Sequence, residues 1–117
     1  MVSGSCFCGD ITFEVEGFVT DVYKCHCSRC RKRFGGASSA AAMAHETAFT
    51  WTRGEALRNS YQAPECKYKS WFCSKCGSLL PLHMKDIQLY WIPMGLLDAD
   101  PEIPLTRHIH LDSKASW

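Results

Sequence analysis

The spacing of the cysteines constrains this chain more than any other feature of its sequence. Eight cysteines occur among 117 residues, and most of them fall into three tight groups. The groups are C-x-C at Cys6 and Cys8, C-x-C-x-x-C at Cys25, Cys27 and Cys30, and C-x-x-C at Cys73 and Cys76. Cysteines this close in sequence are poorly placed to form a disulfide with each other, but they can jointly bind one tetrahedral metal ion.

A secreted protein held by disulfides is the alternative that an even number of cysteines leaves open. The N-terminal residues 1–6 lack the basic and then apolar pattern of a signal peptide. The chain also has no apolar run near the roughly 18 residues needed to span a membrane. We therefore expect a cytoplasmic protein in which the thiols stay reduced and bind metal.

Length and charge further restrict what class of protein the chain can be. The 117 residues lie within the usual range for one domain, so we expect a single domain over residues 1–117. A hydrophobic share of 46% is typical of a globular protein. A formal net charge of +1 gives no electrostatic attraction to nucleic acid or to a membrane surface. Neither is therefore an expected partner, and both a monomer and a homodimer remain open.

The first and third cysteine groups predict one structural zinc site. Four thiolates suit zinc, and a structural site takes all its ligands from the protein. Gly9 and Gly77 follow the two pairs and would let the chain turn beneath the sulfurs. Free buried cysteines are the alternative, but the paired spacing disfavours it. The predicted ligands are Cys6, Cys8, Cys73 and Cys76.

The central group predicts a second zinc site with an open coordination position. Three protein ligands and one exchangeable ligand are typical of catalytic zinc, so Cys25, Cys27 and Cys30 are the candidate catalytic residues. On an extended segment His26 would point to the opposite face, which favours a hydrogen-bonding or packing role over ligation. Cys66 belongs to no group, and it is either an ordinary thiol or a residue that reaches the open site.

Basic residues surround the central group in sequence. They would stabilise thiolates electrostatically, and they could also receive the carboxylates of an anionic substrate. A solvated basic helix face is an equally weighted alternative. Arg29 and Lys32 are the candidate substrate contacts. The whole basic set is Lys24, Arg29, Arg31, Lys32 and Arg33.

Alternation of apolar and polar residues predicts a mainly β protein. Ile11, Phe13 and Val15 alternate with polar residues, which is typical of a half-buried strand. One short helix is expected over residues 29–34, with Ser28 as its N-cap and a Gly-Gly end. Strands are expected at residues 3–7, 10–16, 18–24, 37–44, 49–52, 57–62, 67–72, 79–84, 88–94 and 107–111, with a hairpin turn at Lys85-Asp86.

Four stretches resemble the glutathione-dependent formaldehyde-activating enzyme family, also called the CENP-V/GFA family. The resemblance implies a zinc-stabilised fold of the β-tent type, built of several short antiparallel strands and one short helix. It implies a structural zinc held by the first and third cysteine groups and a second, labile zinc at the central group. The stretches are residues 4–9 (GSCFCG), 25–32 (CHCSRCRK), 72–78 (FCSKCGS) and 108–115 (HIHLDSKA).

The activity implied by this resemblance is that of a carbon–sulfur lyase resembling S-(hydroxymethyl)glutathione synthase. Such an enzyme acts on the adduct of glutathione, or a similar small thiol, with an aldehyde. A non-catalytic zinc module that binds protein or nucleic acid is an alternative, and a thiol or metal sensor is another. The enzyme hypothesis depends on the open position at the central group, whereas a binding module needs none.

Overall fold

The computed structural model describes residues 1–117 and confirms the mainly β prediction. Ten short strands and a single α-helix, α1 (Ser28–Phe34), are joined by turns and by five short 3-10 helices. The strands are β1 (Val2–Ser5), β2 (Thr12–Val15), β3 (Val22–Cys25), β4 (Ala41–His45), β5 (Phe49–Arg53), β6 (Arg58–Gln62), β7 (Lys69–Cys73), β8 (Leu82–Met84), β9 (Leu89–Pro93) and β10 (Leu105–Ile109). The 3-10 helices are η1 (Glu46–Ala48), η2 (Glu55–Leu57), η3 (Lys85–Ile87), η4 (Met94–Leu96) and η5 (Leu111–Ser113).

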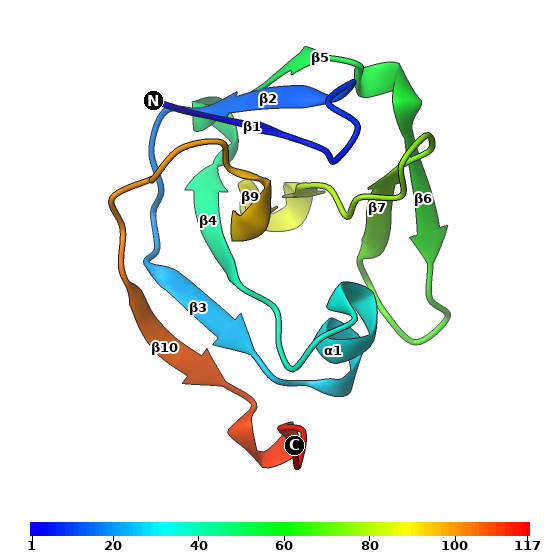
Figure 1. The fold of residues 1–117 in the computed structure, drawn as a ribbon, viewed down its shortest axis with the longest axis vertical. Helices are drawn as coiled ribbons and strands as arrows, with labels where there is room; N and C mark the ends of the chain where they lie inside the picture. Colours follow the sequence, from blue (N-terminus) through cyan, green and yellow to red (C-terminus); the bar gives the residue numbers. More distant parts are fainter.

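The strands form three sheets. One sheet has the order β1-β2-β5, a second has the order β10-β3-β4-β9-β8, and β6 and β7 form a separate two-stranded hairpin. In Figure 1, α1 lies at the lower right, between the end of β3 and the β6–β7 hairpin. All pairings are antiparallel except that of β10 with β3. This parallel pair differs from the expected all-antiparallel arrangement, and it brings the last strand beside the central cysteine group.

Alternating apolar residues of β2 supply the centre of the core. Phe13 and Val15 are fully buried, and they pack with residues of β4, β5 and β9. The ring of Phe49 stacks on that of Tyr90 with 3.9 Å between centroids. This cluster joins the three-stranded sheet to the five-stranded sheet, so the two cysteine-bearing regions are attached to one packed body.

The helix α1 begins one residue earlier than the sequence predicts. Its N-cap is Cys27, not Ser28, and the Cys27 Sγ accepts a hydrogen bond from the Cys30 N–H at 3.4 Å. A cysteine sulfur thereby satisfies an amide that has no partner inside the helix. The expected end at Gly35 is confirmed, because Gly35 adopts the left-handed conformation with φ of 65°.

Several other local predictions are wrong in detail, and the strands expected at 37–44 and 79–84 begin only at Ala41 and Leu82. The third strand begins at Val22 and not at residue 18, because residues 18–21 bond to β4 through single contacts such as Val19 N–H to the Met43 carbonyl, 2.8 Å. Residues 6–9 form a turn and not an extended segment: the Gly9 N–H donates to the Cys6 carbonyl at 3.0 Å, and Gly9 has a φ of 81°. The positive φ expected at Gly9 is confirmed.

Candidate metal centres

Four cysteines from two distant segments meet at one end of the fold. Cys6 and Cys8 lie on the turn after β1, Cys73 is the last residue of β7, and Cys76 lies on the turn that follows. Their four sulfur atoms all lie within 4.8 Å of one another. The Cys6 and Cys8 sulfurs are 3.5 Å apart, and those of Cys8 and Cys73 are 3.9 Å apart across 65 residues of sequence.

The spacing of these sulfurs fits a tetrahedral zinc site. Zinc–sulfur bonds of about 2.3 Å in a regular tetrahedron place the sulfurs about 3.8 Å from each other. The two measured separations lie on either side of that value, and all eight cysteines of the chain are free thiols. The four-cysteine cluster (Cys6, Cys8, Cys73 and Cys76) could therefore hold a metal ion.

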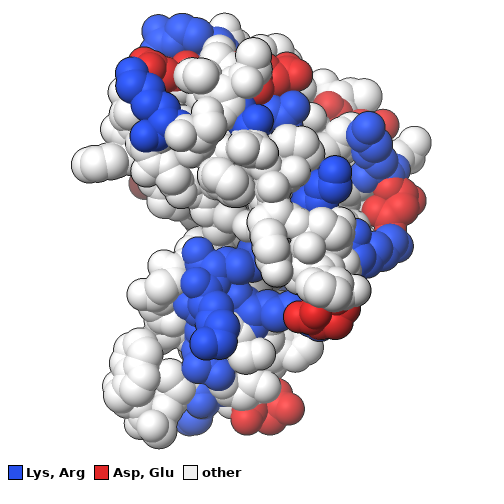
Figure 2. Space-filling model, turned by 90° about the vertical axis from the view of Figure 1, so that its right-hand side faces the viewer, with Lys and Arg blue, Asp and Glu red and all other residues white.

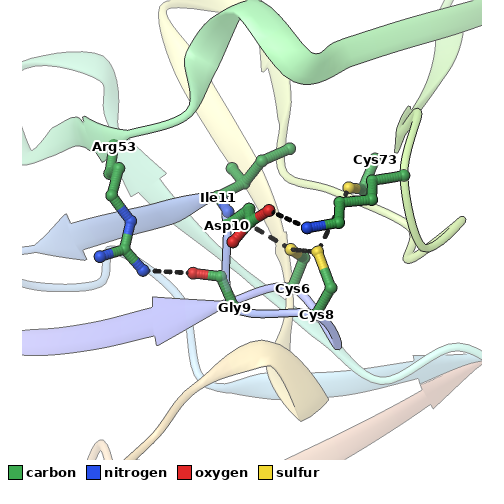
Figure 3. A network of polar contacts seen from close by, with 8 residues as sticks. Cys6, Cys8, Gly9, Asp10, Ile11, Arg53 and Cys73 are labelled. Carbon is green, nitrogen blue, oxygen red and sulfur yellow. Dashed lines mark hydrogen bonds and ion pairs between the residues drawn. The ribbon is translucent and has the colours of Figure 1, made fainter.

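Hydrogen bonds and charges around the cluster hold its two turns in place (Figure 3). The buried Ile11 N–H donates to the Cys6 Sγ at 3.4 Å. Lys75 forms an ion pair with Asp10 at 2.5 Å, and this contact joins the second turn to the first. The guanidinium of Arg53, the last residue of β5, donates a hydrogen bond to the Gly9 carbonyl. Donors directed at a thiolate offset its charge, which favours metal ligation.

The thiols of this cluster do not ionise alike. Burial raises the pKa of Cys76, but hydrogen bonds at Ser78, Cys8 and Cys73 together outweigh burial and the pKa falls to about 5. At Cys8 a backbone hydrogen bond at Asp10 lowers the pKa, yet burial and the neighbouring thiols raise it to about 12. Closely spaced thiolates repel one another, and a bound cation would remove that repulsion.

The three sulfurs of the central group also come together. Cys25 ends β3, Cys27 caps α1 and Cys30 lies in its first turn, and their sulfurs lie within 4.8 Å of one another. Cys25 is buried, whereas Cys27 and Cys30 are partly exposed. Burial raises the pKa of Cys30 to about 12, and the adjacent Cys25 and Cys27 thiols add to this rise. This three-cysteine cluster could hold a metal with one side left for another ligand.

Ser39 supports the three-cysteine cluster, and sequence reasoning missed it. The Ser39 side chain is fully buried, and its Oγ accepts from the Cys25 N–H at 3.1 Å. The Ser39 N–H donates in turn to the Cys25 carbonyl at 2.9 Å. No local pattern marks this serine, because its partner lies 14 residues earlier in the chain.

The structure separates His26 and Cys66 from both clusters. The His26 Nε2 shares a hydrogen bond with the His108 Nδ1 at 2.9 Å, which confirms the hydrogen-bonding role expected for His26. His108 comes from β10, so this contact depends on the parallel pairing of β10 with β3. Cys66 belongs to neither cluster and lies instead in the wall of a cavity between α1 and the β6–β7 hairpin.

The basic residues of α1 divide between two locations. Arg29, Lys32 and Arg33 line the same cavity as Cys66. Arg31 instead donates from its Nε to the His26 carbonyl at 3.4 Å. Three members of the basic run thus share one concave surface, where Arg29 and Lys32 are exposed.

Fold and clusters together define the class of protein: a small, mainly β protein with two cysteine clusters that could each bind metal. The family model described as glutathione-dependent formaldehyde-activating enzyme matches residues 1–113. The chain therefore belongs to this family.

Two relatives agree with this assignment. A curated protein of Halomonas elongata that carries the family's name is 29% identical over 124 residues, covering 100% of this chain and 79% of its own. The crystal structure of a Rhodobacter sphaeroides protein superposes with a TM-score of 0.69 and 29% identity, over 89% of this chain and 99% of that one. No helix is long and apolar enough to cross a membrane.

Proposed function

We propose that this protein is a zinc-dependent carbon–sulfur lyase that acts on the adduct of an aldehyde with glutathione or a similar thiol. The observation that carries the proposal is the cluster of Cys25, Cys27 and Cys30, which gathers three sulfurs and is partly exposed. Membership of the glutathione-dependent formaldehyde-activating enzyme family supports the choice of thiol and aldehyde.

The reaction has a simple balance. In the synthetic direction the thiol sulfur bonds to the aldehyde carbon, the carbonyl π bond breaks, and the thiol proton ends on the oxygen. The lyase direction breaks the same carbon–sulfur bond and returns the proton to sulfur. A zinc ion with an open position would supply the Lewis acidity that lowers a thiol's pKa near neutral pH.

The residues of the chain have separate roles in this proposal. Cys25, Cys27 and Cys30 would hold the second zinc, and the four-cysteine cluster would hold a structural zinc. Arg29 and Lys32 would bind the substrate's negative charge beside the reacting sulfur. Buried Ser39 fixes Cys25, which keeps the three sulfurs in register for the metal.

The variant Cys27→Ser tests the proposal with little risk to the fold. Serine is itself a good N-cap, so α1 keeps its first hydrogen bond while the cluster loses one thiol. We expect a folded protein with one zinc per chain and a rate reduced by about 100-fold or more. The rate is the conversion of glutathione and formaldehyde above the uncatalysed reaction, measured by exchange NMR, and zinc is counted by mass spectrometry.

Cys66→Ser is the matched control for metal content. It makes the same chemical change outside both clusters, so two zinc ions per chain should remain. A folded Cys27→Ser variant with wild-type activity would mean that the three-cysteine cluster is not catalytic. Saturable binding of protein or nucleic acid without any turnover would instead favour a zinc-binding module.

A further inference from the structure

The segment that follows β7 turns back antiparallel to it, but the backbone pairing of the two stops at a proline. The Cys73 N–H donates to the Ser78 carbonyl at 3.0 Å. The Leu80 N–H donates to the Trp71 carbonyl at 2.9 Å. The next residue, Pro81, is fully buried and has no N–H with which to continue this ladder. Beyond Pro81 the chain pairs with β9 as β8, so β7 and β8 belong to different sheets.

A groove of about 350 Å³ lies between β7 and β8. Trp71 of β7 and the buried Leu82 of β8 give it apolar surface. No backbone hydrogen bond joins β7 to β8. Side chains beside the two strands form a bridge instead: Lys67 makes an ion pair with Asp86, and the Tyr68 hydroxyl donates to the same carboxylate at 3.2 Å.

Both strands have a backbone edge without a partner strand at this groove. β8 pairs with β9 alone, so its other edge is free. β7 pairs with β6 along one edge, and its other edge is paired only where the segment with Ser78 and Leu80 contacts it. Unpaired strand edges are the places where another extended chain can add to a sheet.

The groove carries an excess of positive charge. Lys67, Lys69 and Lys85 line it against a single carboxylate, that of Asp86. Lys67 pairs with Asp86, whereas Lys69 and Lys85 form no ion pair. The Lys69 ammonium lies 5.7 Å from the centre of the Trp71 ring, which places a cation beside the aromatic surface. The groove therefore favours a ligand with negative charge.

This groove is distinct from the basic cavity beside α1. That cavity is lined by Arg29, Lys32 and Arg33 and also by Tyr61 and Tyr68, and Tyr68 is the one residue that lines both. Figure 2 looks at the molecule from the side on which Figure 1 places the β6–β7 hairpin, and Lys and Arg side chains cover more of this face than Asp and Glu side chains. The net charge of +1 therefore hides an uneven distribution of charge over the surface.

The free strand edges favour a peptide over other anions. An extended peptide carries N–H and C=O groups at the same spacing as a strand, whereas a nucleic acid could use only the lysines. Successive side chains of an extended peptide point to opposite faces. A peptide that alternates acidic and apolar residues could therefore place its apolar side chains on Trp71 and Leu82 while its carboxylates reach the lysines.

We propose that the groove between β7 and β8 binds an extended acidic peptide segment of a partner protein by strand addition. The peptide backbone pairs with the free edge of β8. Lys69 and Lys85, which have no carboxylate partner in this chain, set the preference for acidic side chains. The interaction is independent of the proposed lyase activity, because it uses neither cysteine cluster.

The peptide acetyl-Glu-Val-Glu-Val-Glu-amide is the probe, because it alternates acidic residues with apolar residues that favour strands. Added to the zinc-loaded protein, it should shift the NMR signals of β8 and slow the amide hydrogen exchange of residues 82–84. Lys69→Gln and Lys85→Gln should each weaken binding about 3-fold, and the double variant about 10-fold. Lys114→Gln is the matched control, since it removes an exposed lysine outside the groove and should leave binding unchanged.

N-methylated peptides separate strand addition from simple attraction between charges. Methylation of both valine amides removes the donors of one peptide edge, and methylation of the glutamate amides removes those of the other, with the charge retained. At least one of the two should bind about 10-fold more weakly than the probe. Equal binding of all three peptides, or no saturable binding of the probe, would overturn the proposal. Oligothymidylate that binds as tightly as the probe, with the same dependence on Lys69 and Lys85, would identify a general polyanion surface and overturn the assignment to a peptide.

Discussion

Ser39 illustrates how one buried polar residue positions a candidate metal ligand. Its side chain has no exposed surface, and its hydroxyl and amide both bond to the backbone of Cys25. Cys25 is the cluster member that ends a strand. The position of its backbone determines the direction in which its sulfur points. A buried amide that loses its acceptor costs about 1–3 kcal/mol, so Ser39 affects both the stability of the fold and the geometry of the cluster.

Ser39→Ala should lower the free energy of unfolding by about 1–3 kcal/mol, because the Cys25 N–H would be left buried without an acceptor. Urea unfolding of the zinc-loaded protein measures the change. Ser38→Ala is the control: Ser38 makes no side-chain hydrogen bond, and its removal should change stability by less than about 0.5 kcal/mol. Equal losses in the two variants would show that the Ser39 hydroxyl contributes nothing specific.

At the scale of elements, α1 connects the cluster to the basic cavity. Its N-cap is a cluster residue, its first turn carries another, and its last turn carries Lys32 and Arg33. The helix is only seven residues long, which is too short to be stable without its ends fixed. Cys27 fixes the first end and Gly35 fixes the second, where a φ of 65° suits glycine and strains other residues.

Gly35→Ala should lower the free energy of unfolding by about 1 kcal/mol, since alanine is disfavoured at this positive φ. Gly36→Ala is a close control, because Gly36 has no positive φ and nothing lies within 4 Å of an added Cβ. Thermal unfolding compares the two variants, and retention of the second zinc during dialysis reports on the cluster. A Gly36→Ala variant as unstable as Gly35→Ala would contradict this account of the helix end.

Local sequence patterns predict where the strands lie better than which strands pair with each other. The alternation of Ile11, Phe13 and Val15 identified β2, and the Lys85-Asp86 turn correctly joined β8 to β9. The parallel pairing of β10 with β3 was missed, because two segments about 80 residues apart leave no local signal for their orientation.

The clusters follow the same rule. Cysteine spacing predicted which sulfurs would meet, because each short C-x-C or C-x-x-C pair is a local ligand motif and two such pairs supply the four ligands of one zinc ion. Ser39 and the wall formed by Tyr61 and Tyr68 depend on tertiary packing, so no motif could have indicated them.

At the scale of the whole molecule, the four-cysteine cluster closes the fold. It joins the turn after β1 to the end of β7, across 65 residues between Cys8 and Cys73. Structural zinc in small sites contributes on the order of 10–16 kcal/mol of apparent binding free energy, whereas a whole domain is stable by about 5–15 kcal/mol. A metal at this cluster would therefore decide whether the chain folds, whereas a metal at the three-cysteine cluster would join only residues within the segment 25–30.

The two clusters should accordingly release metal in two stages. A chelator should first remove one zinc from the three-cysteine cluster with the circular dichroism spectrum unchanged, because three cysteines instead of four would hold that ion and one ligand position would be open. Removal of the second zinc should coincide with unfolding, since the Cys6–Cys8 turn and β7 then lose their common ligand.

Cys73→Ser should accordingly give aggregated or unfolded protein, and Cys27→Ser a folded protein with one zinc. Both variants replace one cysteine by serine, one in each cluster. A difference in folding between the two variants therefore shows which cluster the fold depends on. Soluble Cys73→Ser protein with the wild-type melting temperature would show that the four-cysteine cluster does not hold the fold together.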